Sequence, residues 1–120
     1  MSGETLVIGA SENEARYSNK AIRALRNHNH SVKAIGLRKG KVLDVEFDKE
    51  KKDFQNIETV TLYVGPKNQP EYYDYIVSLK PKRVIFNPGT ENEELYKILK
   101  ENNIDYEEAC TLVMLSTNQY

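Results

Sequence analysis

The sequence predicts an α/β fold in which helices cover both faces of a five-stranded, mostly parallel sheet. Short apolar runs alternate with amphipathic segments along the whole chain, and repeats and low-complexity tracts are absent. The length of 120 residues suits one domain, so we expect a single domain over residues 1–120. With 39% hydrophobic and 29% charged residues, this domain should have a narrow core and a charged surface.

The opening residues predict the first strand and the first helix. Residues 5–8 form an apolar run that ends at Gly9, which is typical of a buried strand. Ser18 is in position to cap a helix that ends near residues 27–29. The apolar face of this helix would carry Ala21, Ile22 and Leu25.

Two further strands and a short arm are expected next. Residues 31–37 predict the second strand, and the alternation of apolar side chains over residues 42–47 indicates a short edge strand or arm. Residues 59–64 are rich in β-branched and aromatic side chains and are followed by Gly65 and Pro66. This pattern predicts the third strand, ended by a turn.

The next segment predicts a second helix and a fourth strand. The helix should begin at Asn68, with Pro70 in its first turn, and should stop at Pro81. Residues 83–86 then predict the fourth strand. The helical spacing is that of Tyr72, Ile76 and Leu79.

The last third of the chain predicts one more helix and strand. Residues 90–93, with the sequence Thr-Glu-Asn-Glu, fit a capping box for a helix that ends near Asn102 and Asn103. Residues 104–107 would form the fifth strand. Residues 110–115 are apolar, but periodicity does not decide between strand and helix there. The apolar face of the helix would carry Leu95, Ile98 and Leu99.

Four loops of unusual composition follow the predicted strands. In open parallel sheets, ligands bind beyond the carboxyl ends of the strands, at the point where the strand order reverses. Function is therefore expected in these loops, which are residues 9–17, 36–41, 64–68 and 87–90.

The formal net charge of -1 hides an uneven distribution of charge. From Arg16 to Lys41 there are 8 basic residues and no acidic one, while the remaining segments hold 9 basic and all 18 acidic residues. This quarter of the chain is a candidate anion site, and the acidic remainder argues against nucleic acid as a partner. Because neither a membrane-spanning stretch nor a signal peptide is recognisable, we expect a cytoplasmic protein without a membrane partner.

Two short segments have the composition of phosphate-binding sites. Gly9, Ala10 and Ser11 stand between a strand and a helix, where backbone amides and the helix dipole hold pyrophosphates, although the glycine fingerprint of dinucleotide sites is missing. An NAD site would have an acidic residue at the end of the second strand, but the chain has Arg38 and Lys39 there. This pair suits a ribose that carries a phosphate, as in NADP or coenzyme A (CoA).

Several segments together resemble the small CoA-binding proteins. These are single-domain relatives of the CoA-binding domain of the succinyl-CoA synthetase alpha subunit. The resemblance covers nearly the whole chain and implies a Rossmann-like α/β/α domain that binds CoA. It is carried by Val7-Ile8-Gly9-Ala10-Ser11, Arg16-Tyr17-Ser18, residues 86–93 (Phe-Asn-Pro-Gly-Thr-Glu-Asn-Glu) and the late Cys110.

The resemblance also assigns roles to the four loops. It implies that Gly9, Ala10 and Ser11 lie at the pyrophosphate, assisted from the same segment by Arg16 and Ser18. It implies that Arg38 or Lys39 reads the phosphorylated ribose; many relatives have Asn-Pro before a Lys here, whereas this chain has Gly36-Leu37 before Arg38, so both basic residues stay open as partners. The adenine or upper pantetheine arm would meet Val64, Gly65 and Pro66, and the lower arm Asn87, Pro88 and Gly89.

Other reactive side chains form no catalytic or metal-binding constellation in the sequence. We interpret Cys110 as a small buried residue, His28 and His30 as surface residues, and the tyrosines of 72–75 as packing. The leading hypothesis is therefore a non-catalytic domain that binds CoA or a short acyl-CoA, with any chemistry supplied by a protein partner. The alternatives are an NADP-binding small reductase and an interaction module whose basic face docks an acidic protein partner.

Overall fold

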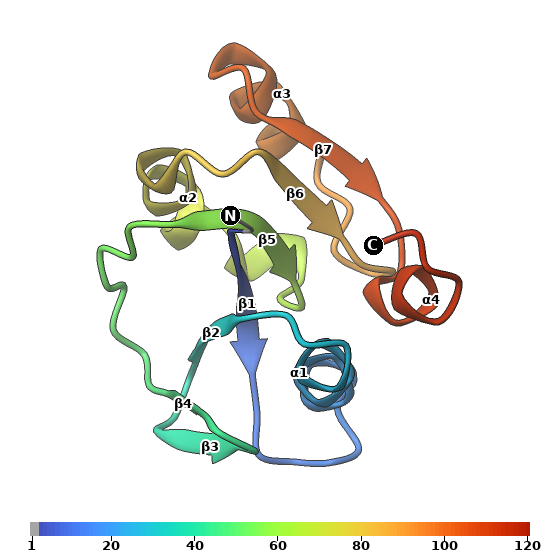
Figure 1. Cartoon of the computed structure of the whole chain (residues 1–120). Coiled ribbons are helices and arrows are strands. Elements are labelled where there is room, and N and C mark those ends of the chain that lie inside the picture. Colours follow the sequence, from blue (N-terminus) through green and yellow to red (C-terminus); the bar gives the residue numbers. More distant parts are fainter. Residues whose placement is uncertain (1–2) are drawn as a thin grey trace.

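The computed structural model describes residues 3–120 and contains a five-stranded sheet in the order β2-β1-β5-β6-β7 (Figure 1). Every pair of neighbouring strands is parallel, which confirms the predicted α/β class. The prediction placed each strand within two residues of its observed position. The strands are β1 (Glu4–Ala10), β2 (Val32–Gly36), β5 (Ile57–Leu62), β6 (Arg83–Phe86) and β7 (Asp105–Glu108).

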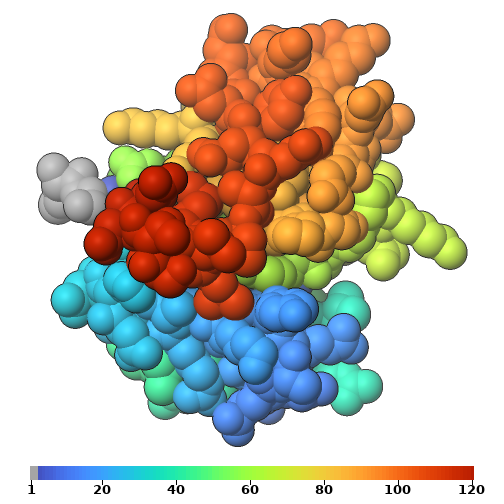
Figure 2. Space-filling model, turned by 90° about the vertical axis from the view of Figure 1, so that its right-hand side faces the viewer, coloured from blue at the N-terminus to red at the C-terminus, as the bar shows by residue number. Residues whose placement is uncertain are grey.

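Four α-helices cover the two faces of this sheet. On one face, α1 and α4 lie side by side, as their blue and red atoms show in Figure 2. On the other face, α2 and α3 are in contact with each other. This arrangement is the predicted α/β/α sandwich. The helices are α1 (Tyr17–Asn27), α2 (Tyr73–Leu79), α3 (Glu93–Glu101) and α4 (Thr111–Ser116).

The core consists of one apolar cluster on each face of the sheet. In β1, Leu6 and Ile8 belong to the cluster under α2 and α3, while Val7 belongs to the cluster under α1. All three side chains are fully buried, as expected for the central strands of a sheet that is covered on both faces. The predicted apolar face of α1 is buried too, which fixes this helix against the sheet.

Two predicted helix caps are wrong. Ser18 does not cap α1: the N-cap position is Arg16, no side chain caps the helix, and Ser18 is buried in the first turn. The capping box at residues 90–93 does not form either, because α3 starts at Glu93 and is capped by Asn92, whose side chain accepts from the Glu94 amide. Thr90 instead donates its hydroxyl proton to the Asn87 carbonyl, which leaves it inside the preceding turn.

The helix predicted to begin at Asn68 begins later. Residues Pro66–Asn68 and Pro70–Tyr72 form two 3-10 turns, and the α-helix starts at Tyr73. Pro70 has no N–H for an α-helical hydrogen bond, so the helix cannot continue through it from the first turn. Lys80 closes α2 in a left-handed conformation (φ 51°), directly before the predicted stop at Pro81.

Residues 40–47 form a hairpin and not the predicted edge strand or arm. Its strands are β3 (Gly40–Val42) and β4 (Val45–Phe47), which pair antiparallel. Leu43 sits at the turn with a positive φ (54°) and is exposed, so it leaves the apolar alternation that suggested one strand. The apolar tail, for which the sequence did not decide between strand and helix, forms the helix α4.

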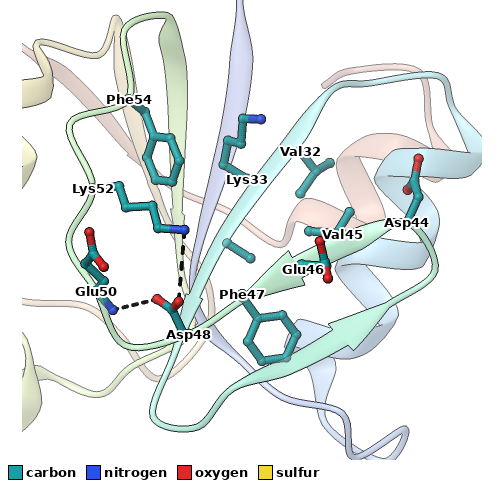
Figure 3. Close-up of a pocket in the computed structure, with 11 residues that line it drawn as sticks. Val32, Lys33, Asp44, Val45, Glu46, Phe47, Asp48, Glu50, Lys52 and Phe54 are labelled. Atoms are coloured by element: carbon teal, nitrogen blue, oxygen red, sulfur yellow. Dashed lines mark hydrogen bonds and ion pairs between the residues drawn. The ribbon is translucent and has the colours of Figure 1, made fainter.

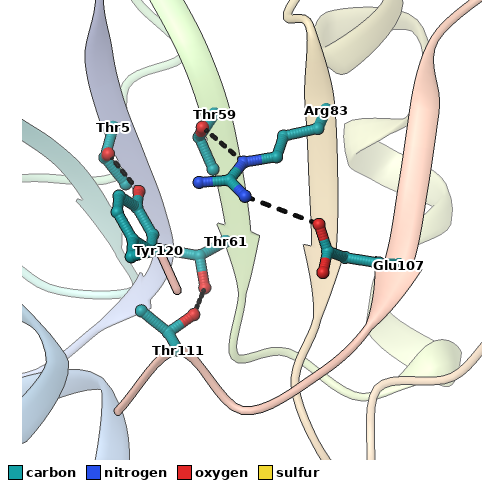
Figure 4. A network of polar contacts seen from close by, with 7 residues as sticks. All are labelled: Thr5, Thr59, Thr61, Arg83, Glu107, Thr111 and Tyr120. Carbon is teal, nitrogen blue, oxygen red and sulfur yellow. Dashed lines mark hydrogen bonds and ion pairs between the residues drawn. The ribbon is translucent and has the colours of Figure 1, made fainter. Parts of the chain in front are cut away.

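The final residue packs back against the sheet. The hydroxyl of Tyr120 bonds that of Thr5, and its ring lies 4.6 Å from the guanidinium of Arg83 (Figure 4). Arg83 in turn donates to Thr59 on β5 and to Glu107 on β7. The chain end is thereby tied to four strands.

Within residues 3–120, no helix is long and apolar enough to cross a membrane.

Candidate functional site

A cavity of about 1010 Å³ lies at the carboxyl edge of the sheet. The loops after β1, β2, β5 and β6 all contribute to its lining, and β1 lies between β2 and β5, where the strand order reverses. This is where ligands bind in open α/β sheets. Eleven of the thirteen predicted site residues line the cavity: Gly9, Ala10, Ser11, Arg16, Ser18, Arg38, Lys39, Val64, Gly65, Pro88 and Gly89.

The other two predicted residues, Asn87 and Pro66, are not part of the lining. The Asn87 amide donates to the Thr61 hydroxyl (2.6 Å) and the Leu62 carbonyl (2.8 Å), and its oxygen accepts from the Thr111 amide (2.9 Å). Its side chain is thus buried and used in joining β5, β6 and α4. Pro66 is exposed at the start of a 3-10 turn.

Gly9 allows the loop after β1 to turn sharply against β5. Its φ is +105°, a conformation that side chains disfavour. A Cβ at this position would lie 3.0 Å from the carbonyl carbon and oxygen of Tyr63. Glycine is therefore required at the first position of the predicted phosphate loop, for both its conformation and its lack of a side chain.

The same loop is held in shape by its own side chains and by α1. The Asn13 amide donates to the Ser11 hydroxyl (3.0 Å), and the buried Asn19 donates to the Ser11 carbonyl (2.9 Å). Arg23 donates to the Asn19 side-chain oxygen at 2.8 Å. Because the Ala15 amide is likewise taken by Asn13, the loop amides at 13 and 15 are occupied.

The amino terminus of α1 faces the cavity through Arg16, Tyr17 and Ser18. Among the described residues, no side chain caps this helix and no acidic residue stands in its first turn. By contrast, α3 has an asparagine cap and two glutamates in its first turn. The positive end of the α1 dipole is therefore uncompensated at a point where an anion could lie.

The basic quarter of the chain divides in the structure. Three of its eight basic residues, Arg16, Arg38 and Lys39, line the cavity. Others turn away: Arg26 makes a two-bond ion pair with Asp44, and Lys33 lies 3.7 Å from Glu4. The basic segment of residues 16–41 therefore supplies one cationic wall of the cavity, and some of its other basic residues form ion pairs elsewhere.

Two glycines leave open room on the opposite wall of the cavity. A Cβ built on Gly65 or on Gly89 would have no neighbour within 4 Å. Gly65 has an ordinary extended conformation (φ -68°), so the backbone does not require glycine at this position. Its lack of a side chain keeps the space beside it open. A narrow group could therefore pass close to the main chain at these positions.

The residues singled out from the sequence leave out nine lining residues, although seven of these lie in the four loops where function was expected. Two of the nine are exposed large apolar side chains, Leu37 and Tyr17, with 83% and 68% of their surfaces accessible. Each stands next to a predicted basic residue, and this adjacency was the signal that could have found them. The remaining ones are Glu12, Asn13, Ala15, Phe47, Tyr63, Asn68 and Thr90.

The polar side chains near the cavity offer little acid–base chemistry. Burial raises the pKa of Tyr63 to about 12, so this lining residue is a neutral phenol at physiological pH. Cys110 is half-buried at the start of α4 and outside the lining, and the tyrosines of 72–75 pack against the core. Within residues 3–120, no three His, Cys, Asp or Glu side chains are grouped to hold a metal ion.

Several solved structures are similar to this chain. A protein described only as uncharacterized is 48% identical, with a TM-score of 0.95 over 100% of this chain and 99% of that one. A hypothetical protein from Pyrococcus horikoshii OT3 is 24% identical, with a TM-score of 0.87 over 97% and 83%. A protein from Thermus thermophilus is 18% identical, with a TM-score of 0.85 over 98% and 91%. The last two likenesses show the fold.

No curated protein sequence matches the chain. A family model described as a CoA binding domain, however, matches residues 4–116, which include every strand and helix of the fold and all the loops of the cavity. The chain therefore belongs to the family of CoA-binding domains.

Proposed function

We propose that this protein binds CoA or a short acyl-CoA in the cavity at the carboxyl edge of its sheet. The observation that carries the proposal is the cavity itself, which unites a cationic wall, an uncapped helix amino terminus and a glycine-lined channel. These three features correspond to the three parts of CoA: a phosphorylated ribose, a pyrophosphate and a narrow pantetheine arm.

The pyrophosphate lies at the loop after β1 and the start of α1. Since the amides of residues 13 and 15 are occupied, its contacts come from the helix end and from Arg16. The ribose 3′-phosphate is read by Arg38 or Lys39, and the exposed Leu37 beside them packs on the adenine. Burying this leucine against the base removes an apolar side chain from water.

The pantetheine arm runs over Gly65 and Gly89, between Val64 and Pro88. Neither glycine has a neighbour where a side chain would stand, so the arm fits closely against the main chain there. A short acyl group on the thiol is compatible with the volume of the cavity.

The protein acts as a binder and carries out no reaction on its own. Support comes from the chemistry of the lining. Of its two phenols, Tyr17 and Tyr63, the more buried Tyr63 has a raised pKa, and the one carboxylate of the described lining, Glu12, already accepts a main-chain hydrogen bond. A nucleophile paired with a base, the usual sign of group-transfer chemistry, is absent from the described lining. Any reaction at the CoA thiol would be supplied by a partner protein.

NADP is the second candidate ligand. The residues that follow β2 are cationic, which favours any ribose phosphate, including the 2′-phosphate of NADP. Docking of an acidic protein has less support, because only three basic residues of the quarter share the cavity wall and Arg26 is already paired with Asp44.

Thermal unfolding in the presence of CoA, dephospho-CoA, NADP and NAD tests these assignments. A ligand that binds only the folded state stabilises it by RT ln(1 + [L]/Kd), about 2.7 kcal/mol at a concentration of 100 Kd. We expect the largest shift with CoA, a smaller one with dephospho-CoA and little with NAD.

Each other outcome has a clear meaning. No shift with CoA at millimolar concentration would exclude CoA binding. A larger shift with NADP than with CoA would select the second candidate. Binding of a short acyl-CoA is tested in the same way, by thermal unfolding with acetyl-CoA. Release of free CoA thiol in that sample would contradict the non-catalytic role.

A further inference from the structure

Glu12 is an unexpected residue in a cavity for a polyanion. It stands in the loop after β1, lines the cavity and carries a negative charge close to the predicted phosphate sites. Repulsion between this carboxylate and a phosphate would weaken binding, and the structure must offset this cost if the cavity holds CoA. The contacts of Glu12 show what it provides in return.

The Glu12 carboxylate accepts a hydrogen bond from the main-chain N–H of Lys41, at 3.0 Å. Lys41 belongs to β3, two residues after the basic pair Arg38 and Lys39. The bond therefore joins the loop that follows β1 to the hairpin that follows β2.

Packing reinforces this bond. A Cβ on Gly40 would lie 2.7 Å from Cγ of Glu12 and 2.8 Å from the ring of Phe47, so the stem of Glu12 sits directly on the glycine main chain. Glu12 and the buried Phe47 thus both pack on the side of Gly40 where a side chain would stand. The contact fixes the base of the hairpin, where Arg38 and Lys39 enter it.

The hairpin has two other anchors, one of them two residues before Arg38 and the other at the hairpin tip. The Gly36 amide bonds the Asp48 carbonyl at the end of β4, at 3.0 Å. At the hairpin tip, Asp44 pairs with Arg26 on α1, at 2.8 Å. Figure 3 shows Asp44 at the tip and Phe47 near the base, and both residues line a second cavity. These anchors tie the hairpin to the end of β2 and to α1, while Glu12 ties it to the pyrophosphate loop.

We infer that Glu12 is a positioning residue that sets the specificity of the cavity for a 3′-phosphorylated ligand over its dephospho form. Through Lys41 it fixes the spacing between the pyrophosphate loop and the Arg38–Lys39 pair. This spacing must match the distance between the pyrophosphate and the 3′-phosphate of CoA. The inference rests on the proposed function. Charge and position predict opposite effects of losing Glu12, because removing its charge favours the ligand while releasing the basic pair disfavours the 3′-phosphate.

Isothermal titration of CoA and dephospho-CoA into four proteins separates the two effects. The proteins are the unaltered chain, Glu12→Ala, Glu12→Gln and Glu14→Ala. Glutamine keeps an oxygen that accepts from Lys41 but loses the charge. Glu14 is an exposed carboxylate of the same loop that is outside the cavity lining, so its variant controls for the loss of one negative charge.

The quantity measured is the ratio of the dephospho-CoA Kd to the CoA Kd. We expect Glu12→Ala to lower this ratio by about threefold to tenfold, the range of one net hydrogen bond. Glu12→Gln and Glu14→Ala should keep the ratio of the unaltered chain or raise it slightly. Thermal unfolding without ligand should show four folded proteins, with a small decrease only in Glu12→Ala, which loses the exposed bond to Lys41.

An unchanged or higher ratio in Glu12→Ala would overturn the inference and leave CoA binding intact, since Glu12 would then act by charge alone. An equal fall in Glu12→Gln would overturn it too. A chain that binds CoA and dephospho-CoA equally well would remove the specificity that Glu12 is inferred to set. Failure of the unaltered chain to bind CoA would overturn the proposed function itself.

Discussion

Gly9 and Gly65 illustrate two different reasons for a glycine in a protein. At Gly9 the main chain has a positive φ and touches Tyr63, so a side chain is excluded by the fold. At Gly65 the conformation is ordinary and the space is empty, so a side chain is compatible with the fold. The absence of a side chain at Gly65 therefore leaves the room that the proposed pantetheine arm needs.

Gly65→Leu tests this interpretation. The free protein should unfold at nearly the same temperature, because the leucine enters open space, while CoA should bind at least about tenfold more weakly, the equivalent of about 1.4 kcal/mol. Titration calorimetry and thermal unfolding supply the two measurements. Lys67→Leu, on the exposed turn next to the cavity, is the control for an added apolar side chain. Full CoA affinity in Gly65→Leu would place the pantetheine arm elsewhere.

Arg38 is the second residue whose role can be measured directly. Reversing its charge in Arg38→Glu should weaken CoA binding by roughly 1–3 kcal/mol, the range of a charge-assisted hydrogen bond, and should weaken dephospho-CoA binding less. Lys39→Glu in parallel identifies which of the two reads the phosphate. Lys49→Glu makes the same change of charge at an exposed site outside the cavity lining and should have little effect. An equal loss for both ligands would assign Arg38 to another part of CoA.

At the scale of elements, the two longest helices begin in opposite ways. Asn92 caps α3 and also donates to Gln69 and to Tyr73, both at 2.8 Å. The fully buried Gln69 donates to the carbonyls of Val64 and Thr90. The cap of α3 is thus part of the network that joins the two cavity loops after β5 and β6.

Asn92→Ala should therefore cost more than the loss of an ordinary cap. We expect about 1–3 kcal/mol of unfolding free energy, because the cap bonds are lost and the buried Gln69 oxygen loses its donor. Denaturant unfolding gives the value. Asn92→Asp keeps the capping oxygen but not the amide donor, so an intermediate loss is expected. Thr90→Ala reports on the predicted capping box: if Thr90 costs more than Asn92, the cap assignment is wrong.

The sequence predicted the elements better than their ends. Apolar runs such as residues 5–8 have few alternatives once a core must form, and these strands were found correctly. Helix starts depend on single side chains, and the chain offers competing candidates: Thr90 and Asn92 both suit a cap, and only the turn at Asn87 decides between them. The hairpin was missed because Leu43 adopts a left-handed conformation that apolar residues rarely use.

At the scale of the whole molecule, the last residue of the sequence, Tyr120, holds the edge of the sheet that lies opposite the cavity. The ring of Tyr120 packs on Arg83 and lies edge-on to His30, with ring centroids 4.8 Å apart. Partial burial, together with the charges of His28 and Arg83, lowers the pKa of His30 below its ordinary value of 6.5. The unfolded chain therefore binds a proton to His30 more readily than the folded chain does.

Stability should accordingly depend on pH in a defined direction. The free energy of unfolding should be constant above about pH 7.5 and should fall as the pH drops through 6.5 towards the lowered pKa of folded His30. Denaturant unfolding between pH 8 and pH 5.5 measures the slope. His30→Asn should reduce it most, whereas His28→Asn should reduce it only in part, because it removes one of the charges that lower the His30 pKa and leaves burial in place. A slope that survives in His30→Asn would assign the effect to other groups.

The order of the strands is a property that no local pattern specifies. The chain alternates strands and helices, and this alternation predicts a parallel sheet with a ligand edge. It does not say that β1 lies between β2 and β5, which is what brings the loops of residues 9–18, 37–39 and 63–68 around one cavity.

By itself, the sequence determined the fold class, the strands and the four cavity loops, because apolar periodicity and turn composition are local signals. The resemblance to CoA-binding proteins supplied several of the eleven predicted residues that line the cavity. Only the tertiary structure decided that Asn87 faces the interior, that Leu37 and Tyr17 stand at the rim, and that Glu12 reaches Lys41. These features depend on contacts between segments far apart in the chain. Such contacts form only when the sheet has assembled, so no pattern along the sequence contains them.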